Sequence, residues 1–233
     1  MQLDNLFEAL KLDHLGAQCD ALLEQAAKKD LGYRELLTEA LTCEWQGRKQ
    51  KGTESRLAQA RLPWLKTLEQ FDFSFQPSID RKVVRELSTL GFVGRAENIV
   101  LLGPPGVGKT HIAIGLGLAA CRQDHRVRFY TVTNLVNELQ DAQANHQLPK
   151  FLDKALRYQL VILDEFGYVP FSPTGAQLLF QFCAALHERV SLIVTTNLPF
   201  SDWIQVLGDE RLASGLLDRL TYQSHILEFR GES

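Results

Sequence analysis

Two kinds of hydrophobic pattern run along this chain. Up to residue 60, apolar positions recur with the helical spacing i, i+3, i+4 and i+7, as in the set Leu3, Leu6, Phe7 and Leu10. From residue 80 onward, short runs typical of strands alternate with helical segments. We therefore predict an N-terminal all-helical domain at residues 1–66 and an α/β domain at residues 67–233.

An irregular connection joins the two predicted domains. It contains Pro63 and three closely spaced phenylalanines, Phe71, Phe73 and Phe75. We expect these rings to pack in the core of the second domain, and the alternative is that they form a platform for an adenine base.

The pattern of the second domain predicts a parallel β-sheet covered by helices on both faces. We expect strands near residues 99–102, 127–131, 160–164, 191–196 and 225–229. The intervening helices are predicted at residues 109–122, 134–143, 150–158 and 174–188, with one or two more within 201–222. The run Leu160 to Leu163 is apolar throughout, which is typical of a strand buried on both faces. The predicted fold class is therefore α/β.

The segment after the first predicted strand carries the strongest signal for chemistry. Residues 103–110 read GPPGVGKT and fit the phosphate-binding loop pattern G-x-x-x-x-G-K-[ST]. Its glycines let backbone N–H groups turn toward phosphates, and the helix that follows adds its positive dipole end. Lys109 would bring a positive charge to the β and γ phosphates, and Thr110 would offer a hydroxyl to Mg²⁺. The expected ATP contacts are Gly103, Pro104, Pro105, Gly106, Val107, Gly108, Lys109, Thr110 and His111.

Polar residues at the ends of later strands complete the predicted catalytic site. Asp164 follows an apolar strand and is placed to hold the Mg²⁺ shell, while Glu165 is placed to activate a water molecule. Asn197 follows the next strand and could hydrogen-bond the same water or the γ-phosphate, or else cap the turn at Pro199. Arg219 is an arginine finger for a neighbouring subunit, or else it forms an intrahelical pair with Asp218 or is a surface charge.

Four segments of this sequence resemble a known family. They are GPPGVGKTH, LVILDEFGYVPF, LIVTTNLPFSDW and GDERLASGLLDRL, and in this order they look like the AAA+ ATPases. The last two are similar to ATP-binding helper proteins of insertion-sequence transposition, the IstB type, which are related to DnaC-type helicase loaders. The resemblance implies the sheet order 5-1-4-3-2, no C-terminal lid, and Asn197 as the sensor residue. It also implies Arg219 as the arginine finger, with Arg211 as a rival.

The resemblance further implies a helical element between the second and third strands that touches DNA in the centre of an oligomer. In this interval Lys150, Lys154 and Arg157 are spaced by four and three residues, on one face of the predicted helix. Such a row could follow the phosphates of double-stranded DNA without reading its sequence, or it could be an ordinary solvated face. A second basic run at residues 48–66 could contact DNA, protein or only water.

The net charge, the cysteine spacing and the lengths of the apolar runs limit the kind of protein that this chain can be. The net charge is −3 and the pI is near 6.1, so any contact with DNA must use a local patch. The four cysteines, Cys19, Cys43, Cys121 and Cys183, lack zinc-ligand spacing, and we expect them to be reduced packing residues. No apolar run approaches the length that spans a bilayer, and no secretory signal is recognisable. These features favour a cytoplasmic protein without a membrane partner.

Together the residues and the resemblance favour an ATP-dependent, DNA-binding regulator of transposition. We expect it to oligomerise on target DNA, to hydrolyse ATP with Mg²⁺, and to deliver the target to a cognate transposase. A helicase loader would share every ATPase residue. A small-molecule kinase would use the same loop, but Glu165 and an outward arginine favour hydrolysis over transfer to a metabolite. A nucleotide-gated scaffold without turnover is disfavoured because Lys109, Asp164 and Glu165 are all present.

Overall fold

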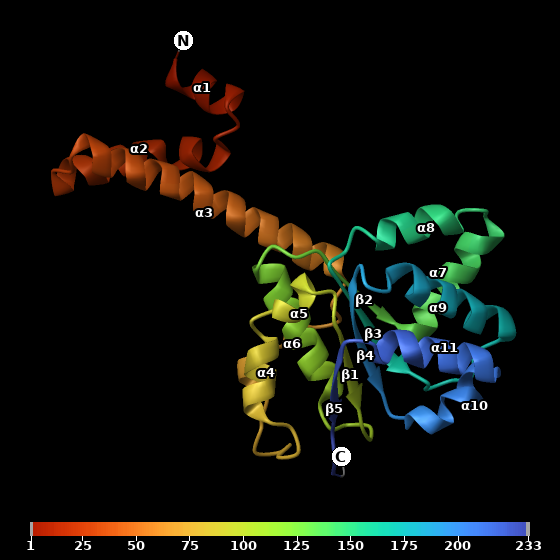
Figure 1. The fold of residues 1–233 in the computed structure, drawn as a ribbon. Helices are drawn as coiled ribbons and strands as arrows, with labels where there is room; N and C mark the ends of the chain where they lie inside the picture. Colours follow the sequence, from red (N-terminus) through yellow and green to blue (C-terminus); the bar gives the residue numbers. More distant parts are fainter. Residues whose placement is uncertain (1, 232–233) are drawn as a thin grey trace. The chain divides into compact units, whose positions relative to one another are not determined.

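The computed structural model describes residues 2–231 of the 233-residue chain (Figure 1). The chain divides into two compact units, Met1–Ser55 and Arg56–Ser233, and the division falls inside the long helix α3 (Tyr33–Ala60). A domain boundary at residues 66 and 67 stays a prediction. Within the described residues, no helix is both long and apolar enough to cross a bilayer.

The first unit consists of α1 (Leu3–Ala9), α2 (Asp13–Lys29) and most of α3. Helix α2 ends at Asp30, which adopts a left-handed conformation with φ of 51°. The two long helices approach closely at Gly47, where a Cβ would lie 2.2 Å from Cγ of His14. Nearby, the carboxylate of Glu44 is buried and accepts a hydrogen bond from the backbone N–H of Leu15 at 2.8 Å. This unit is therefore held by a few close contacts rather than by a large apolar core.

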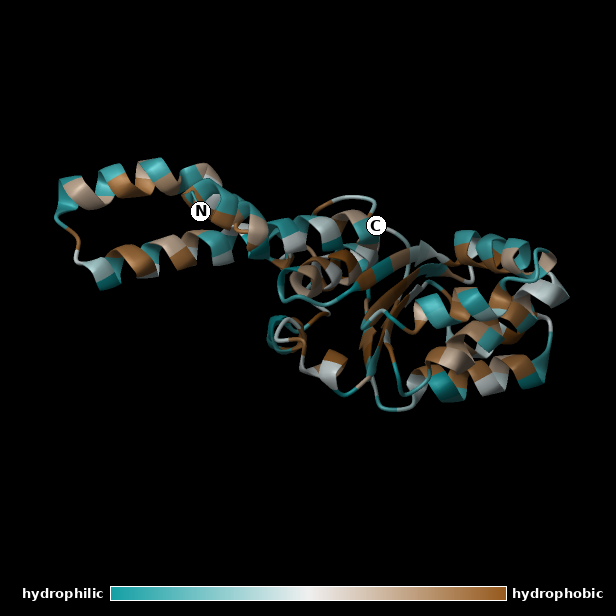
Figure 2. Ribbon diagram, turned by 90° about the horizontal axis from the view of Figure 1, so that it is seen from above, coloured by the Kyte–Doolittle hydropathy of each residue, from teal (hydrophilic) through white to brown (hydrophobic). Residues whose placement is uncertain are grey.

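The second unit is built on a five-stranded sheet in the order β2-β3-β4-β1-β5, and all four strand pairs are parallel. This order confirms the predicted 5-1-4-3-2 arrangement. The strands are β1 (Asn98–Leu102), β2 (Val127–Thr131), β3 (Leu160–Phe166), β4 (Ser191–Thr196) and β5 (Ser224–Glu228). Figure 2 shows that the strands are mostly hydrophobic whereas the helices alternate between hydrophobic and hydrophilic residues.

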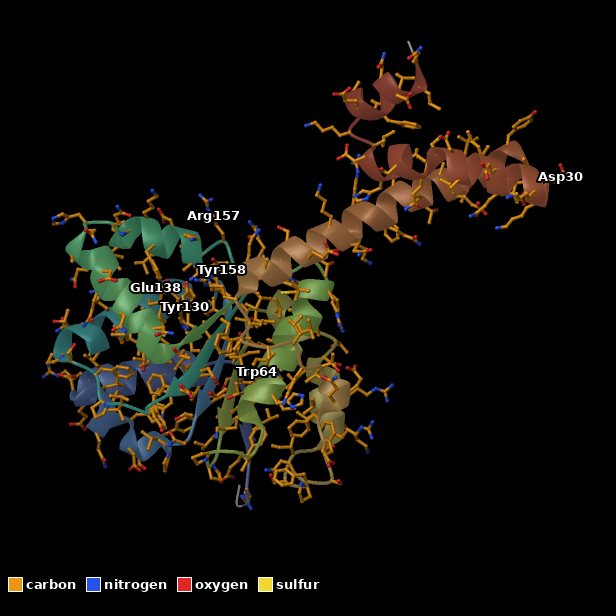
Figure 3. All side chains as sticks on the ribbon, turned by 180° about the vertical axis from the view of Figure 1, so that it is seen from behind. Asp30, Trp64, Tyr130, Glu138, Arg157 and Tyr158 are labelled. Carbon is orange, nitrogen blue, oxygen red and sulfur yellow. The ribbon has the colours of Figure 1, made fainter. Side chains whose placement is uncertain are left out.

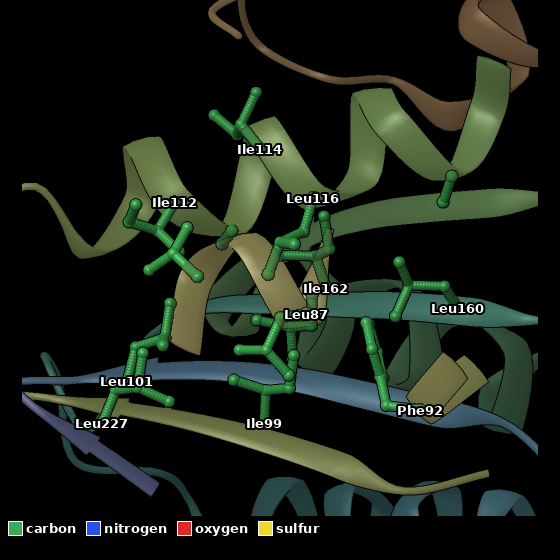
Figure 4. Packing of buried hydrophobic residues seen from close by; sticks show 14 of the residues in the cluster. Leu87, Phe92, Ile99, Leu101, Ile112, Ile114, Leu116, Leu160, Ile162 and Leu227 are labelled. Carbon is green, nitrogen blue, oxygen red and sulfur yellow. The ribbon is translucent and has the colours of Figure 1, made fainter. Parts of the chain in front are cut away.

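Helices cover both faces of the sheet. They are η1 (Leu68–Gln70), α4 (Arg81–Leu87), α5 (Gly91–Gly94), α6 (Lys109–Arg122), α7 (Val132–Ala144), α8 (Leu148–Ala155), α9 (Pro173–Leu186), η2 (Phe200–Asp202), α10 (Trp203–Leu207) and α11 (Glu210–Thr221). Helices α4, α5 and α6 pack on one face, and Figure 4 shows Ile112 and Leu116 of α6 packed with strand residues such as Leu101. Helices α7, α9 and α11 pack on the other face.

The first half of strand β3 shows why runs of the sheet are apolar. Leu160 and Ile162 belong to the cluster with α6, whereas Val161 and Leu163 belong to the cluster with α7 and α9. Successive side chains of a strand point to opposite faces, so a strand covered by helices on both sides carries consecutive apolar residues.

The end of helix α8 corrects one sequence-based prediction. The helix predicted at residues 150–158 ends at Ala155, and Arg157 lies in the turn that follows. There the backbone N–H of Arg157 donates to the carbonyl of Lys154 at 3.1 Å, and the chain reaches β3 three residues later. The prediction that Arg157 shares a helix face with Lys150 and Lys154 was therefore wrong, although all three side chains are exposed.

Candidate nucleotide site

The phosphate-binding loop connects β1 to α6 at the carboxyl edge of the sheet. Gly103, Gly106 and Gly108 adopt φ values of 151°, 79° and 94°, which side chains rarely tolerate. A Cβ on Gly103 would lie 2.3 Å from the carbonyl oxygen of Phe229, and one on Gly108 would lie 2.5 Å from Cε2 of Phe71. Glycine is therefore required at both positions for backbone conformation and for space.

Lys109 is the first residue of α6 and is held across the loop. Its Nζ donates to the carbonyl oxygens of Gly103 at 2.6 Å and Pro104 at 2.5 Å. Burial lowers the pKa of the Lys109 ammonium, and the nearby carboxylate of Asp164 opposes that shift. The ammonium thus donates to two carbonyl groups of the loop.

Asp164 is buried at the end of β3 and accepts two hydrogen bonds on the same oxygen. Oγ1 of Thr110 lies 2.8 Å from Oδ1 of Asp164, and Oγ1 of Thr195 lies 2.6 Å from it. The carboxylate and the Thr110 hydroxyl come from different elements and are hard oxygen ligands of the kind that Mg²⁺ prefers. These two side chains therefore fit the predicted Mg²⁺ ligands.

Glu165 occupies an irregular position in β3. The pairing of β3 with β4 shifts between Leu163 and Phe166, and Glu165 adopts φ of 61°, in the left-handed region. Its side chain is exposed, while its backbone N–H donates to Oγ1 of Thr195 at 3.0 Å. Because left-handed backbone is costly for a residue with a side chain, this position is strained.

One of the two roles considered for Asn197, the cap of the turn at Pro199, is taken by its neighbour Thr196. The turn after β4 is capped by Thr196, whose Oγ1 accepts a hydrogen bond from the N–H of Leu198 at 3.1 Å. Asn197 is half-buried and directly follows β4, on the strand next to β3 in the sheet. The cap at this turn is thus supplied by the neighbouring threonine rather than by Asn197.

A cavity of about 770 Å³ lies beside the loop and α6. Its walls include loop residues from Gly106 onward and, from the connection before α4, the partly exposed Trp64 and Phe75 (Figure 3 labels Trp64). Trp64 was not among the predicted site residues, although an aromatic residue directly after Pro63 was a usable signal. Of the three phenylalanines, Phe71 is buried as expected, whereas Phe75 is 61% exposed, so the core prediction was wrong for Phe75.

Phe71 packs the connection before α4 against the phosphate-binding loop. Its ring lies against Gly108 and makes edge contacts with His111 and Phe73, with ring centroids 5.3 Å and 4.9 Å away. Nε2 of His111 also lies 2.8 Å from the carbonyl oxygen of Thr67. His111 therefore helps to hold the wall of the cavity in addition to being a candidate nucleotide contact.

The two candidate arginine fingers lie on α11 in different surroundings. Nη1 of Arg219 donates to the carbonyl of Gly215 at 2.6 Å, and its guanidinium lies 4.6 Å from the ring centroid of Phe180. Its observed partners thus do not include Asp218. Arg211 lies in the first turn of the same helix and is exposed. Arg219 is held by contacts with Gly215 and Phe180 of the same chain, and Arg211 is exposed.

The candidate DNA residues lie on α8 and in the turn that follows it. Among the described residues, none of Lys150, Lys154 and Arg157 forms an ion pair. In the basic run at 48–66, by contrast, several cations already have acidic partners: Arg48 pairs with Glu44, Arg56 with Asp124 and Arg61 with Glu138. The run therefore offers less free positive charge than its composition indicates.

Comparison with known proteins assigns the family. The family described as IstB-like ATP binding protein matches residues 5–233. This chain belongs to that family. The IstB-like chain is 51% identical over 232 residues to the insertion sequence IS21 putative ATP-binding protein of Pseudomonas aeruginosa, covering 100% of this chain and 88% of the relative. It is 38% identical over 224 residues to the insertion sequence IS5376 putative ATP-binding protein of Geobacillus stearothermophilus, covering 96% and 89%.

Solved structures show the fold of this IstB-like protein. The crystal structure of the DnaC helicase loader matches with a TM-score of 0.54 and 19% identity, covering 64% of this chain and 87% of that one. The crystal structure of DnaI matches with a TM-score of 0.59 and 18% identity, covering 71% and 91%. The family is described as ATP-binding, and the chain shares the fold of these two structures.

Proposed function

We propose that this protein is an Mg²⁺-dependent ATPase that assembles on double-stranded DNA and delivers that DNA to the transposase of its insertion sequence. The observation that carries the ATPase proposal is the contact of Thr110 with Asp164 beside a phosphate-binding loop, with the exposed Glu165 next to Asp164 in β3. A protein that only held nucleotide would not require an exposed acid next to the buried one.

The chemistry follows from where these groups lie. The loop N–H groups and Lys109 would bind the β and γ phosphates, and Trp64 and Phe75 would border the base in the cavity. Mg²⁺, held by Thr110 and Asp164, would neutralise charge on the phosphates. Glu165 would take the proton from a water whose oxygen bonds to the γ-phosphorus while the bond to the β–γ bridging oxygen breaks. The products are ADP and inorganic phosphate.

Two further groups are assigned to this reaction. Asn197 would hydrogen-bond the attacking water or the γ-phosphate, supported by its place directly after β4 and by the turn cap that Thr196 supplies. Arg219 would act on the nucleotide of a neighbouring copy, which requires a homo-oligomer. The exposed Arg211 is the alternative for that role.

The proposal for DNA rests on charge and on the relatives. Lys150, Lys154 and Arg157 are exposed and gathered on α8 and the turn after it, in a chain that is acidic overall. Phosphates would pair with these cations without reading the base sequence. The named relatives belong to insertion sequences, which supports a transposase as the protein partner and the cytoplasm as the place of action.

The proposal is tested by measuring phosphate release with and without duplex DNA, together with the particle mass in each state. We expect ATP and DNA together to produce large assemblies and faster turnover. ATP turnover without any DNA-dependent assembly would refute the proposed role as a DNA-binding regulator of transposition. Transfer of the γ-phosphate to a metabolite in place of water would indicate a kinase.

A helicase loader is the second candidate, because the DnaC loader shares this fold. Binding to a replicative helicase and not to a transposase would favour that candidate.

A further inference from the structure

One buried hydroxyl links the two acids of the candidate site. Thr195 is 2% exposed and lies near the end of β4, between β3 and β1 in the sheet. Its Oγ1 donates to Oδ1 of Asp164 at 2.6 Å and accepts from the N–H of Glu165 at 3.0 Å. The hydroxyl hydrogen and one lone pair are therefore used on adjacent residues of the neighbouring strand.

The irregularity in β3 explains why a hydroxyl is needed there. Pairing of β3 with β4 shifts between Leu163 and Phe166, so the residues between them leave the regular ladder. A partly buried backbone N–H that leaves the ladder needs another acceptor, and Thr195 supplies it for Glu165. The same contact supports the left-handed backbone of Glu165, which local preference disfavours.

Packing alone does not account for a threonine at this position. The residues before it, Ile193 and Val194, are buried apolar side chains of the central strand. Valine has nearly the same shape as threonine and would fill the space without a hydroxyl to satisfy. What valine would lose is the pair of contacts to Asp164 and Glu165.

We propose that Thr195 is a positioning residue for ATP hydrolysis, whose hydroxyl orients the carboxylate of Asp164 and the backbone of Glu165 together. This inference rests on the proposed function. With Thr110 bonded to the same oxygen of Asp164, the hydroxyl completes a chain from the start of α6 through β3 to β4. Displacing the two acids by a fraction of an ångström would disturb the geometry of the attacking water more than the binding of the nucleotide.

The test compares Thr195→Val and Thr195→Ser with Ser191→Ala as a matched control. Ser191 is also a buried hydroxyl of β4, but it lies at the opposite end of the strand and donates to the carbonyl of Phe92. For Thr195→Val we expect kcat to fall about tenfold to hundredfold while KM for ATP changes less than about threefold. We expect the Thr195→Ser variant to recover most of the rate, and the control to stay within about twofold of the parent protein.

Binding provides a readout apart from turnover. A fluorescent ATP analogue is titrated in EDTA and at increasing Mg²⁺, with thermal unfolding measured in parallel. We expect Thr195→Val to keep its affinity in EDTA but to need more Mg²⁺ for its full affinity. If that variant is too unstable to study, Thr195→Ala lacks the same hydroxyl and cannot overpack the strand.

Three outcomes are decisive. Parent-like kcat and Mg²⁺ dependence in Thr195→Val would overturn the inference, as would equal losses in Thr195→Val and Ser191→Ala. Failure of the serine variant to recover the rate would also overturn it. If the parent protein releases no phosphate, the proposed function fails, and the Mg²⁺-dependent part of nucleotide binding still decides the role of Thr195.

Discussion

The contact between Gly108 and Phe71 leads to a quantitative prediction for Gly108→Ala. Gly108 has φ of 94° and ψ of 12°, and left-handed backbone costs an L-residue roughly 1–2 kcal/mol. The new Cβ would lie 2.5 Å from Cε2 of Phe71, a buried ring that Phe73 and His111 restrain. Forcing such a ring aside costs about 1–3 kcal/mol. We therefore expect a total loss of about 2–5 kcal/mol in the free energy of unfolding.

The assay is thermal and urea unfolding of the full chain, followed by titration with an ATP analogue. At roughly 2–4 °C per kcal/mol, Tm for the unit containing the loop should fall by about 4–20 °C. ATP affinity should fall as well, because Gly108 and Phe71 both line the cavity beside the loop. Gly94→Ala is the control, since a Cβ there meets no atom within 4 Å. A Gly108→Ala protein with the Tm and ATP affinity of the parent would refute this account of the loop.

Three further predictions address the proposed function. Glu165→Gln should keep ATP affinity and lose about two to four decades of turnover, the range for a general base; lost affinity with normal turnover would contradict the assignment. Arg219→Ala should lose about three decades or more of turnover, and mixing it with Glu165→Gln should restore some activity through intact sites between subunits; no recovery at any ratio would point to Arg211 or to a role within one subunit. Replacing Lys150, Lys154 and Arg157 with alanine should weaken binding to unrelated duplexes equally and lower the magnitude of the dependence of log affinity on log salt concentration by up to about three units. The control variant replaces Arg48, Lys49 and Lys51, and the predicted site is wrong if only this control loses affinity.

Local patterns were sufficient to predict the strands and the loop, whereas the order of the strands came from the family resemblance. Every predicted strand is present, because burial between two layers of helices demands runs such as Leu160 to Leu163 that no exposed segment would carry. The loop was recognisable because its glycines adopt backbone conformations that few other residues tolerate. In both cases the physical requirement acts on the residue itself and is therefore visible in its type.

Features that depend on distant parts of the chain were not predictable in the same way. Thr195 looks like any β-branched strand residue, and its contacts arise from an irregularity in the adjacent strand that leaves no pattern of its own. Trp64 borders the cavity only because the connection passes beside the loop. Arg157 continues the helical spacing of Lys150 and Lys154, but the helix stops at Ala155 and the chain turns into β3.

The left-handed backbone at Glu165 means that this position is not optimised for stability. A glycine would adopt φ of 61° without strain, and relieving such strain is worth about 1–2 kcal/mol. A search for thermostable variants that ignores turnover would therefore favour replacement of this acid early, and the more durable protein would lose its proposed general base. Such a trade-off between durability and activity is expected where a reacting side chain is held on disfavoured backbone. Stability engineering of this fold should accordingly leave residue 165 unchanged and seek its gains elsewhere.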